Sequence, residues 1–179
     1  MAPLHRLPSS LALREAVRML LRPASDDDAE AVARLWTEGY TGAGPGGRST
    51  PYSVAEFFAV ARHGQPFVAL EGEDLVGIVV FFGPEAEGRT VAAEGEAELT
   101  KLVVADAARG RGIGRALSEL CAELARESGA EAIALWSRPY QLDGHRLYES
   151  LGYRRRPECD HDDADGRRLI FRLDLQVTP

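Results

Sequence analysis

A glycine run set between an apolar stretch and an amphipathic stretch constrains the fold of this chain most. The run comprises Arg109-Gly110-Arg111-Gly112-Ile113-Gly114, after the apolar residues 99–104 and before a helical pattern over 116–124. This order predicts a strand, a glycine turn and a helix. Glycines let backbone N–H groups converge on a ligand, and a helix that begins there directs the positive end of its dipole at an anion. The run is therefore the candidate ligand site, and phosphate or pyrophosphate is the expected ligand.

Composition limits the class of protein. The 179 residues, 45% of them hydrophobic, suit one domain with a full core. A net charge of −7 and the lack of a basic block with interleaved aromatics argue against a nucleic-acid partner. Cys121 and Cys159 have no CxxC spacing, and charges interrupt the apolar residues 11–21. We therefore expect a soluble, cytoplasmic protein without a metal or a membrane partner, present as a monomer or a homodimer.

Periodicity and turn residues predict the order of the elements. A flexible N-terminal arm is predicted over 1–16 and a single domain over 17–179. Strands are predicted over 17–22, 67–70, 75–82, 98–104, 132–136, 153–156 and 167–175. Helices are predicted over 29–36, from Pro51 through Val60, from the glycine run to Ser128, and over 143–150. A glycine-rich loop is predicted over 39–49 and an acidic loop over 158–166.

The glycine run does not match either of two known nucleotide-binding motifs. A P-loop ends in Gly-Lys-Ser/Thr, whereas Gly114 is followed by Arg115-Ala116. The dinucleotide fingerprint G-x-G-x-x-G requires a third glycine where Arg115 stands. A glycine turn with a purely structural role remains an alternative at this point.

The run resembles motif A of the GNAT N-acetyltransferase superfamily, Arg/Gln-x-x-Gly-x-Gly/Ala, which Arg109, Gly112 and Gly114 match. A second signature of that superfamily, Leu-Tyr-Glu-x-x-Gly-Phe/Tyr, is similar to residues 147–153. The resemblance covers nearly the whole chain except its ends and residues 39–49. It implies an α/β fold, α+β by some schemes: a single domain whose mixed central sheet has about six to seven strands and about four flanking helices. The sheet is expected to splay between the strands 98–104 and 132–136.

The resemblance also implies how a cofactor would be held. In this superfamily acetyl-CoA donates the acetyl group, and a primary amine attacks the thioester directly. Backbone N–H groups at the start of the helix would hold the pyrophosphate, and the pantetheine arm would add to one strand edge like a further strand. The candidate cofactor-binding residues are Leu102, Val103, Val104, Arg109, Gly110, Arg111, Gly112, Ile113, Gly114, Arg115 and Gln141. Gln141 occupies the position where the superfamily frequently has Asn. The arginine side chains could instead be ordinary surface residues that contact no ligand.

Tyr148 is similar in position to the general acid of the superfamily, and a phenol with an ordinary pKa of about 10 can protonate a thiolate. Glu98 is the candidate general base, because many members place a carboxylate at the start of the cofactor strand. Glu94 and Glu96 lie on the same face of the predicted strand as Glu98, but an acidic run of this kind is more often a solvent-exposed surface than part of an active site. His145 is a reserve candidate on the helix of Tyr148.

The sequence thus predicts an N-acetyltransferase that moves an acetyl group from acetyl-CoA to a primary amine. A small-molecule amine is favoured over a protein N-terminus or a lysine. The alternative is a non-catalytic acyl-CoA sensor on the same fold. A nucleotide-dependent oxidoreductase would need the missing glycine spacing.

Overall fold

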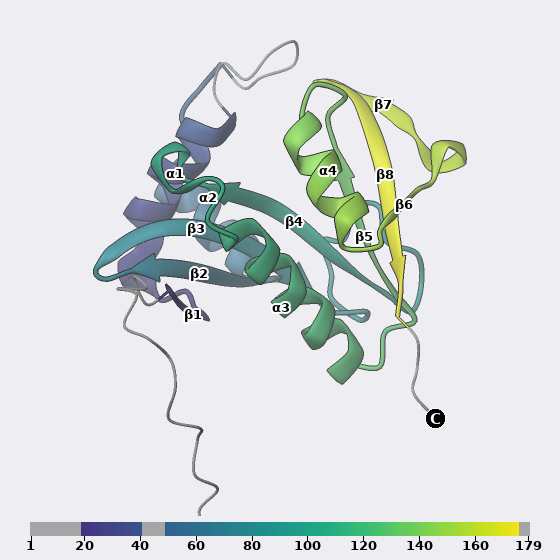
Figure 1. Cartoon of the computed structure of the whole chain (residues 1–179), viewed down its shortest axis with the longest axis horizontal. Coiled ribbons are helices and arrows are strands. Elements are labelled where there is room, and N and C mark those ends of the chain that lie inside the picture. Colours follow the sequence, from purple (N-terminus) through teal and green to yellow (C-terminus); the bar gives the residue numbers. More distant parts are fainter. Residues whose placement is uncertain (1–18, 41–48, 176–179) are drawn as a thin grey trace, which may run out of the picture.

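The computed structural model describes residues 19–40 and 49–175 (Figure 1). The strands are β1 (Met19–Pro23), β2 (Gln65–Glu71), β3 (Asp74–Phe82), β4 (Glu96–Val104), β5 (Ala132–Ser137), β6 (Arg154–Arg155), β7 (His161–Asp163) and β8 (Gly166–Asp174). The helices are α1 (Ala29–Tyr40), α2 (Val54–Ala61), α3 (Ile113–Glu127) and α4 (Leu142–Ser150), with 3-10 turns η1 (Asp26–Asp28), η2 (Asp106–Ala108) and η3 (Pro157–Cys159). The predicted arm over 1–16, and residues 41–48 of the predicted glycine-rich loop, lie outside the described residues.

All strands belong to one mixed sheet with the order β1-β2-β3-β4-β5-β8-β6, and β7 pairs with β8. Neighbours are antiparallel except β4 and β5, which are parallel as the helical crossover α3 predicts. These two strands pair only from Glu96 with Ala132 to Glu98 with Ala134. Beyond that point they diverge, which confirms the predicted splay (Figure 1).

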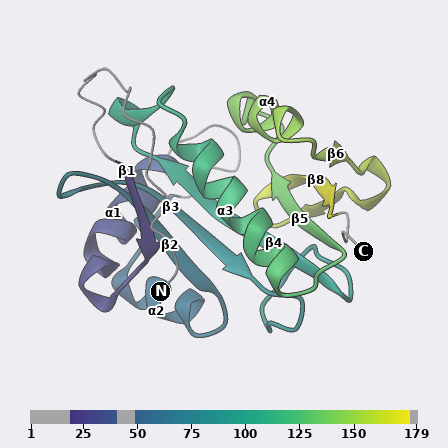
Figure 2. The same ribbon diagram turned by 60° about the horizontal axis from the view of Figure 1, so that its bottom comes forward.

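Helices cover both faces of the sheet (Figure 2). Alternate residues of β3 point to opposite faces, so Val79 and Phe81 join the core beneath α3 and α4. Ile78, Val80 and Phe82 join the core beneath α1 and α2 instead. A strand buried on both faces reads as a continuous apolar run, which is the pattern of residues 75–82.

A bulge interrupts β4 opposite β3. The pairing register shifts between Ile78 and Val80, and Lys101 of β4 has a left-handed backbone with φ 52°. An extra residue of this kind bends a strand and increases its twist. The bulge therefore lies where β4 leaves β5, and it contributes to the divergence of the two strands.

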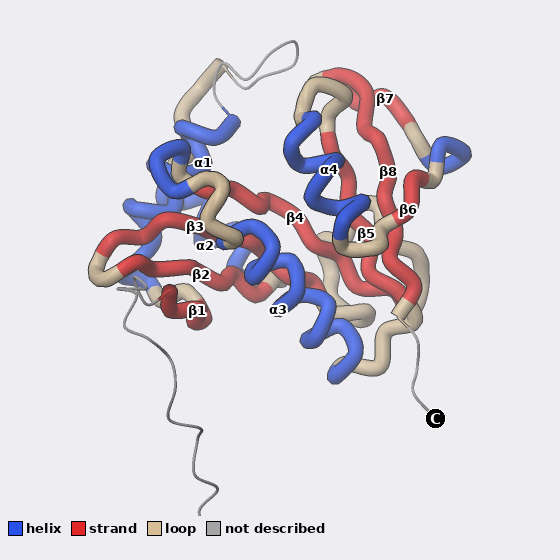
Figure 3. Tube along the Cα trace, viewed as in Figure 1, coloured by secondary structure: helices blue, strands red, loops and turns tan. Residues whose placement is uncertain are grey.

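Two predicted boundaries were wrong. The sequence predicts a loop at Gly39, but this residue lies inside α1. A Cβ there would come within 2.6 Å of Val103 Cγ1, so the glycine lets the end of the helix pack closely on β4. The acidic loop 158–166 contains β7, which brings the strands to eight (Figure 3). Arg138 and Arg168 pair with Asp163 at 3.0 and 2.5 Å, so the acidic charge is neutralised and the hairpin forms.

No helix within residues 19–40 or 49–175 is both long enough and apolar enough to cross a membrane. The predicted cytoplasmic location stays a prediction.

An ion pair ties β1 to the turn before α1. Arg22 donates two hydrogen bonds to the Asp28 carboxylate, at 2.7 and 2.9 Å, and Ser25 N donates a third at 2.7 Å. The hydrogen bonds from Arg22, against the opposing effect of burial, lower the pKa of Asp28 from 3.8 to about 2.

Replacing Asp28 with Asn should therefore lower the free energy of unfolding by about 1–2 kcal/mol at pH 7. Because the folded-state pKa is depressed, the wild-type advantage should be complete above about pH 4 and should disappear as the pH falls towards 2. Urea unfolding of both proteins across this pH range measures the difference. Asp27→Asn, an exposed neighbour, is the control. A deficit that does not change with pH would contradict the ion-pair explanation.

Candidate active site

The glycine turn places unbonded N–H groups at the start of α3. Gly110 and Gly112 have φ values of 78° and 84°, and a Cβ on either would meet no atom within 4 Å. The first backbone bond of the helix runs from Ala116 N to Gly112 O at 3.0 Å. The N–H groups before Ala116 therefore have no acceptor in the helix, and they point outward at the positive end of its dipole.

The charges around this turn suit an anion. The first turn of α3 contains no acidic residue, and Arg115 lies there instead. A cation at a helix N-terminus is unfavourable by itself, whereas a bound anion would compensate both the cation and the dipole. The geometry therefore agrees with the predicted phosphate ligand.

The two arginines of the run and the next residue, Arg115, contact other protein groups. Arg109 pairs with Asp106 at 2.7 Å, and Arg111 pairs with Glu71 at the same distance. Arg115 donates to Ser150 Oγ at 2.8 Å, which links α3 to α4. Each side chain is about half exposed, at 57, 53 and 45%. Because the guanidinium groups already have protein partners, an anion at this turn would meet the backbone N–H groups first.

Residues 99–104 of β4 have no partner on β5, whereas Val103 and Val104 pair with Ile78 and Gly77 on β3. Val103 is buried beneath α1, and Leu102 and Val104 pack against the core beneath α3. Leu102 O accepts a long hydrogen bond from Tyr40 Oη at 3.4 Å. The end of β4 thus combines ordinary core side chains with a strand edge that β5 leaves uncovered.

Tyr148 of α4 is 7% exposed, and its ring packs against Tyr153 and Phe171 at centroid distances of 5.8 and 5.7 Å. Burial, and to a smaller extent Cys121, raises the pKa of Tyr148 above its ordinary value. The phenol therefore remains protonated at neutral pH and can act as a donor.

Gln141 closes the turn between β5 and α4. Its Oε1 accepts hydrogen bonds from Ser137 Oγ at 3.0 Å and from Arg138 N at 2.8 Å. Because the side-chain oxygen is occupied, the amide NH₂ is the part of Gln141 that can contact a ligand.

Glu98 is anchored. The side chain of Glu98 is buried, and its Oε2 accepts hydrogen bonds from the backbone N–H groups of Thr90, Val91 and Ala92 at 2.6, 2.8 and 3.2 Å. The hydroxyl of Thr90 donates to Oε1 at 2.9 Å. Four donors thus occupy both oxygens of the predicted base. The geometry favours a role in holding the loop between β3 and β4 over one in proton abstraction.

The weaker candidates for the base also have structural partners or lie at the surface. Glu96 pairs with Arg172 at 2.6 Å, and Glu94 is exposed. His145 Nε2 lies 3.0 Å from Arg138 O, which ties α4 to the end of β5.

An aromatic cage around Lys101 was missed by the sequence analysis. The ammonium lies 4.5 Å from the ring centroid of Tyr52, 4.9 Å from that of Trp36 and 6.0 Å from that of Tyr40. One signal could have revealed it: Lys101 is the sole lysine of a chain with 20 arginines, and it interrupts an apolar strand.

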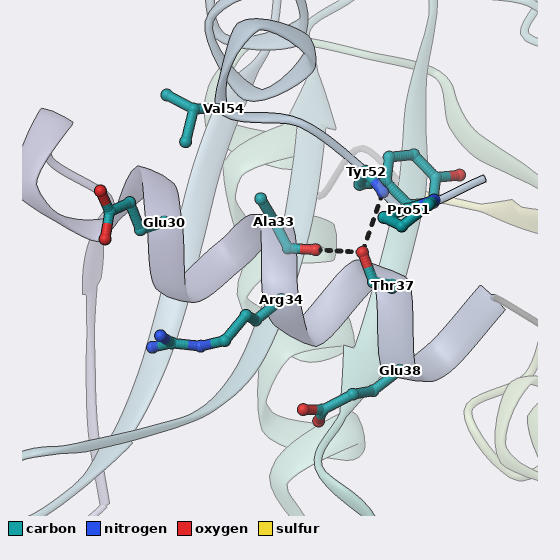
Figure 4. Close-up of a pocket in the computed structure, with 8 residues that line it drawn as sticks. All are labelled: Glu30, Ala33, Arg34, Thr37, Glu38, Pro51, Tyr52 and Val54. Carbon is teal, nitrogen blue, oxygen red and sulfur yellow. Dashed lines mark hydrogen bonds between the residues drawn. The ribbon is translucent and has the colours of Figure 1, made fainter.

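A shallow hollow lies between α1 and the segment that leads into α2 (Figure 4). Its lining residues are Glu30, Ala33, Arg34, Thr37, Glu38, Pro51, Tyr52 and Val54. Thr37 Oγ1 donates to Ala33 O at 2.7 Å and accepts from Tyr52 N at 2.9 Å, which holds Tyr52 against α1. The hollow is on the α1 face, opposite the glycine turn and α3. In the described part of the chain, no group of His, Cys, Asp and Glu could hold a metal ion.

Residues 29–153 match the model of the acetyltransferase (GNAT) family. N-acetylaspartate synthetase from Rattus norvegicus is 34% identical over 113 residues, which are 62% of this chain and 36% of that protein. The protein of the same name from Xenopus tropicalis is 30% identical over 132 residues, 69% of this chain and 46% of that protein. The chain spans less than half the length of these curated relatives.

Solved structures share the fold. The yncA protein of Salmonella typhimurium, solved with its cofactor acetyl-CoA, has a TM-score of 0.70 and 18% identity, covering 89% of this chain and 95% of that one. The ribosomal-protein-alanine N-acetyltransferase from Brucella melitensis has a TM-score of 0.71 and 20% identity, covering 87% of this chain and 99% of that one.

Glu98→Gln should lower the free energy of unfolding by about 1–3 kcal/mol, because it removes the charge that four donors surround. The thermal midpoint should fall by several degrees, measured by differential scanning calorimetry. Glu94→Gln is the matched control, since that carboxylate is exposed nearby. An unchanged midpoint, together with loss of the acidic limb of a pH–rate profile, would instead identify Glu98 as a base.

Proposed function

The chain belongs to the acetyltransferase (GNAT) family, a family of acetyl-CoA-dependent acyltransferases, and we propose that it acetylates the primary amine of a small molecule. The observation that carries the proposal is the end of β4–β5 pairing after Glu98, next to a helix whose first N–H groups have no acceptor in that helix. Such a divergence can accept an extended amide-bearing arm, and the helix start can accept its phosphates.

The residues present fit acetyl-CoA as the donor. The N–H groups at the start of α3 would hold the pyrophosphate, because Gly110 and Gly112 leave the space in front of them open. Leu102 and Val104 would bind the amides of the pantetheine arm through their backbone groups, and the NH₂ of Gln141 would add a donor from the β5 side.

Tyr148 would donate the proton that the leaving thiolate requires. A neutral amine attacks the thioester carbonyl, so that a C–N bond forms and the C–S bond breaks. The departing thiolate takes the proton of the Tyr148 hydroxyl, which burial keeps protonated. The amide nitrogen loses its extra proton to solvent, and the phenolate regains one. A backbone N–H at the free edge of β4 would stabilise the oxyanion, for which one such donor is worth roughly 3 kcal/mol.

The similarity to N-acetylaspartate synthetases supports an amino acid as the acceptor. The protein of Brucella melitensis is named for a ribosomal-protein alanine, which makes a protein N-terminus the runner-up. Thiol release from acetyl-CoA, measured with amino acids, polyamines and an alanine-terminated peptide, tests the proposal. We expect the amino acids to be acetylated. Tight binding of acetyl-CoA with no thiol release across the panel would instead identify an acyl-CoA sensor.

Tyr148→Phe should lower kcat by about 100-fold or more, because the proton donor to the thiolate is lost. The affinity for acetyl-CoA, measured by calorimetry, should stay within twofold of wild type. Tyr153→Phe is the matched control. The ring of Tyr153 packs against that of Tyr148, and its buried hydroxyl has no hydrogen-bond partner among the described residues. Equal kcat in Tyr148→Phe and wild type would remove Tyr148 from the mechanism.

Gly112→Ala should raise the Kd for acetyl-CoA by about 10-fold or more, because its methyl group would project into the open space before the N–H groups. Gly129→Ala is the control at the other end of α3, where φ is 74° and a Cβ also meets nothing within 4 Å. Both variants carry similar backbone strain, so their thermal midpoints should fall alike while only Gly112→Ala loses affinity. Equal affinities would disprove the pyrophosphate assignment.

A further inference from the structure

We propose that Lys101 binds a carboxylate of the acceptor and thereby selects anionic amines, amino acids foremost, over neutral and cationic ones. This assignment rests on the acetyl transfer proposed above and names the residue that would determine acceptor choice.

Lys101 lies where β4 leaves β5. Lys101 stands three residues beyond the last β4–β5 pair, Glu98 with Ala134, and directly before Leu102. Its left-handed backbone, φ 52°, is uncommon for a residue other than glycine. Backbone strain of this kind persists where the surrounding structure enforces it, and it is frequent at functional sites. Here the strained residue lies at the divergence that would receive the thioester.

The aromatic cage around Lys101 is rigid. Trp36 is fully buried, and its ring lies 5.6 Å from that of Tyr52, which in turn lies 5.9 Å from that of Tyr40. Tyr52 is held by its backbone bond to Thr37, and its hydroxyl accepts from Lys101 Nζ at 3.4 Å. Ring faces attract a cation without neutralising it. The cage therefore holds the ammonium in place next to the uncovered end of β4.

Tyr40 links the cage to the strand that would hold the pantetheine arm. Its hydroxyl donates to Leu102 O at 3.4 Å, and burial raises the pKa of Tyr40, so this donor stays protonated. The caged ammonium and the uncovered end of β4 are therefore joined through one side chain. An acceptor whose amine reaches the thioester at this end of β4 would place its own carboxylate towards Lys101.

The charge of Lys101 contrasts with the net charge of the chain. The chain carries a net charge of −7, which by itself would favour a cationic acceptor. A fixed ammonium in a partly buried, aromatic environment reverses that preference locally, because charges there interact more strongly than in water. The chain uses arginine at 20 positions and lysine at this one alone. A compact ammonium fits between three rings more readily than a planar guanidinium does.

The test compares amino acids with their α-carboxamides, pairs that share the reacting amine and differ in one charge. In wild type, kcat/KM should be higher for aspartate than for its α-amide. Lys101→Met should lower this acid-to-amide ratio by about 10- to 100-fold, through the KM for the acid. The KM for acetyl-CoA should not change, and the thermal midpoint should fall only modestly, by the loss of the cation–π contacts and of the hydrogen bond to Tyr52. Lys101→Arg should restore part of the ratio.

Arg34→Met is the matched control, because it removes an exposed positive charge from the same helix as Trp36 and Tyr40 but outside the cage. Its ratio should stay within twofold of wild type. An acid-to-amide ratio that is the same in Lys101→Met and wild type, or a wild-type preference for the amide, would overturn the proposal even if acetyl transfer is observed.

A binding measurement separates this proposal from the proposed function. Because the chain has one lysine, ¹³Cε-lysine labelling of the untagged protein gives a single lysine signal. In the presence of CoA, that signal should shift saturably on titration with aspartate, and the shift should be weaker with the α-amide. A saturable shift without thiol release would retain the carboxylate site and reject acetyl transfer. No shift, with acetylation of aspartate intact, would reject Lys101 and retain the transferase.

Discussion

The early end of the pairing between β4 and β5 is the constraint on which the rest of the structure depends. A strand edge that is fully paired cannot bind the amides of a ligand, whereas an edge released after three residue pairs can. The bulge at Lys101 bends β4 away from its neighbour at this point. The glycine turn follows the end of β4, and α4 follows the end of β5, so both elements face the region that the divergence opens. The candidate site thus results from the early end of the pairing between β4 and β5.

The second organising feature is how the acidic residues are neutralised. Glu98 is surrounded by donors from residues 90–92, and Glu96 pairs with Arg172. Asp163 is held by Arg138 and Arg168, whose guanidinium groups lie 4.9 and 4.3 Å from the ring centroid of Trp136. These internal pairings take up acidic charge close to β5. The start of α3, whose first turn has no acidic residue, can then act as a local positive site in a chain with a net negative charge.

The predictions that succeeded concern local order. Strand, glycine turn and helix follow one another within the residues 98–128, and the parallel arrangement of β4 and β5 follows from the crossover between them. The predictions that failed concern contacts between distant segments. Gly39 continues α1 because of Val103, and the acidic loop forms β7 because Arg138 supplies a counter-charge 25 residues away. Spacing along the chain does not report such partners.

The sequence by itself determined the order of elements, the glycine cradle and the tyrosine of the second signature, because each depends on residues that are close together in the chain. Only the tertiary structure decided what the isolated side chains do. Glu98 became an anchor through residues 90–92, and Lys101 entered a cage built from α1 and the segment before α2. The environment of Lys101 depends on side chains from distant parts of the chain, and that of Glu98 depends on the loop conformation that turns three backbone N–H groups towards it. In both cases the folded backbone, rather than the local sequence pattern, sets the environment of a charge.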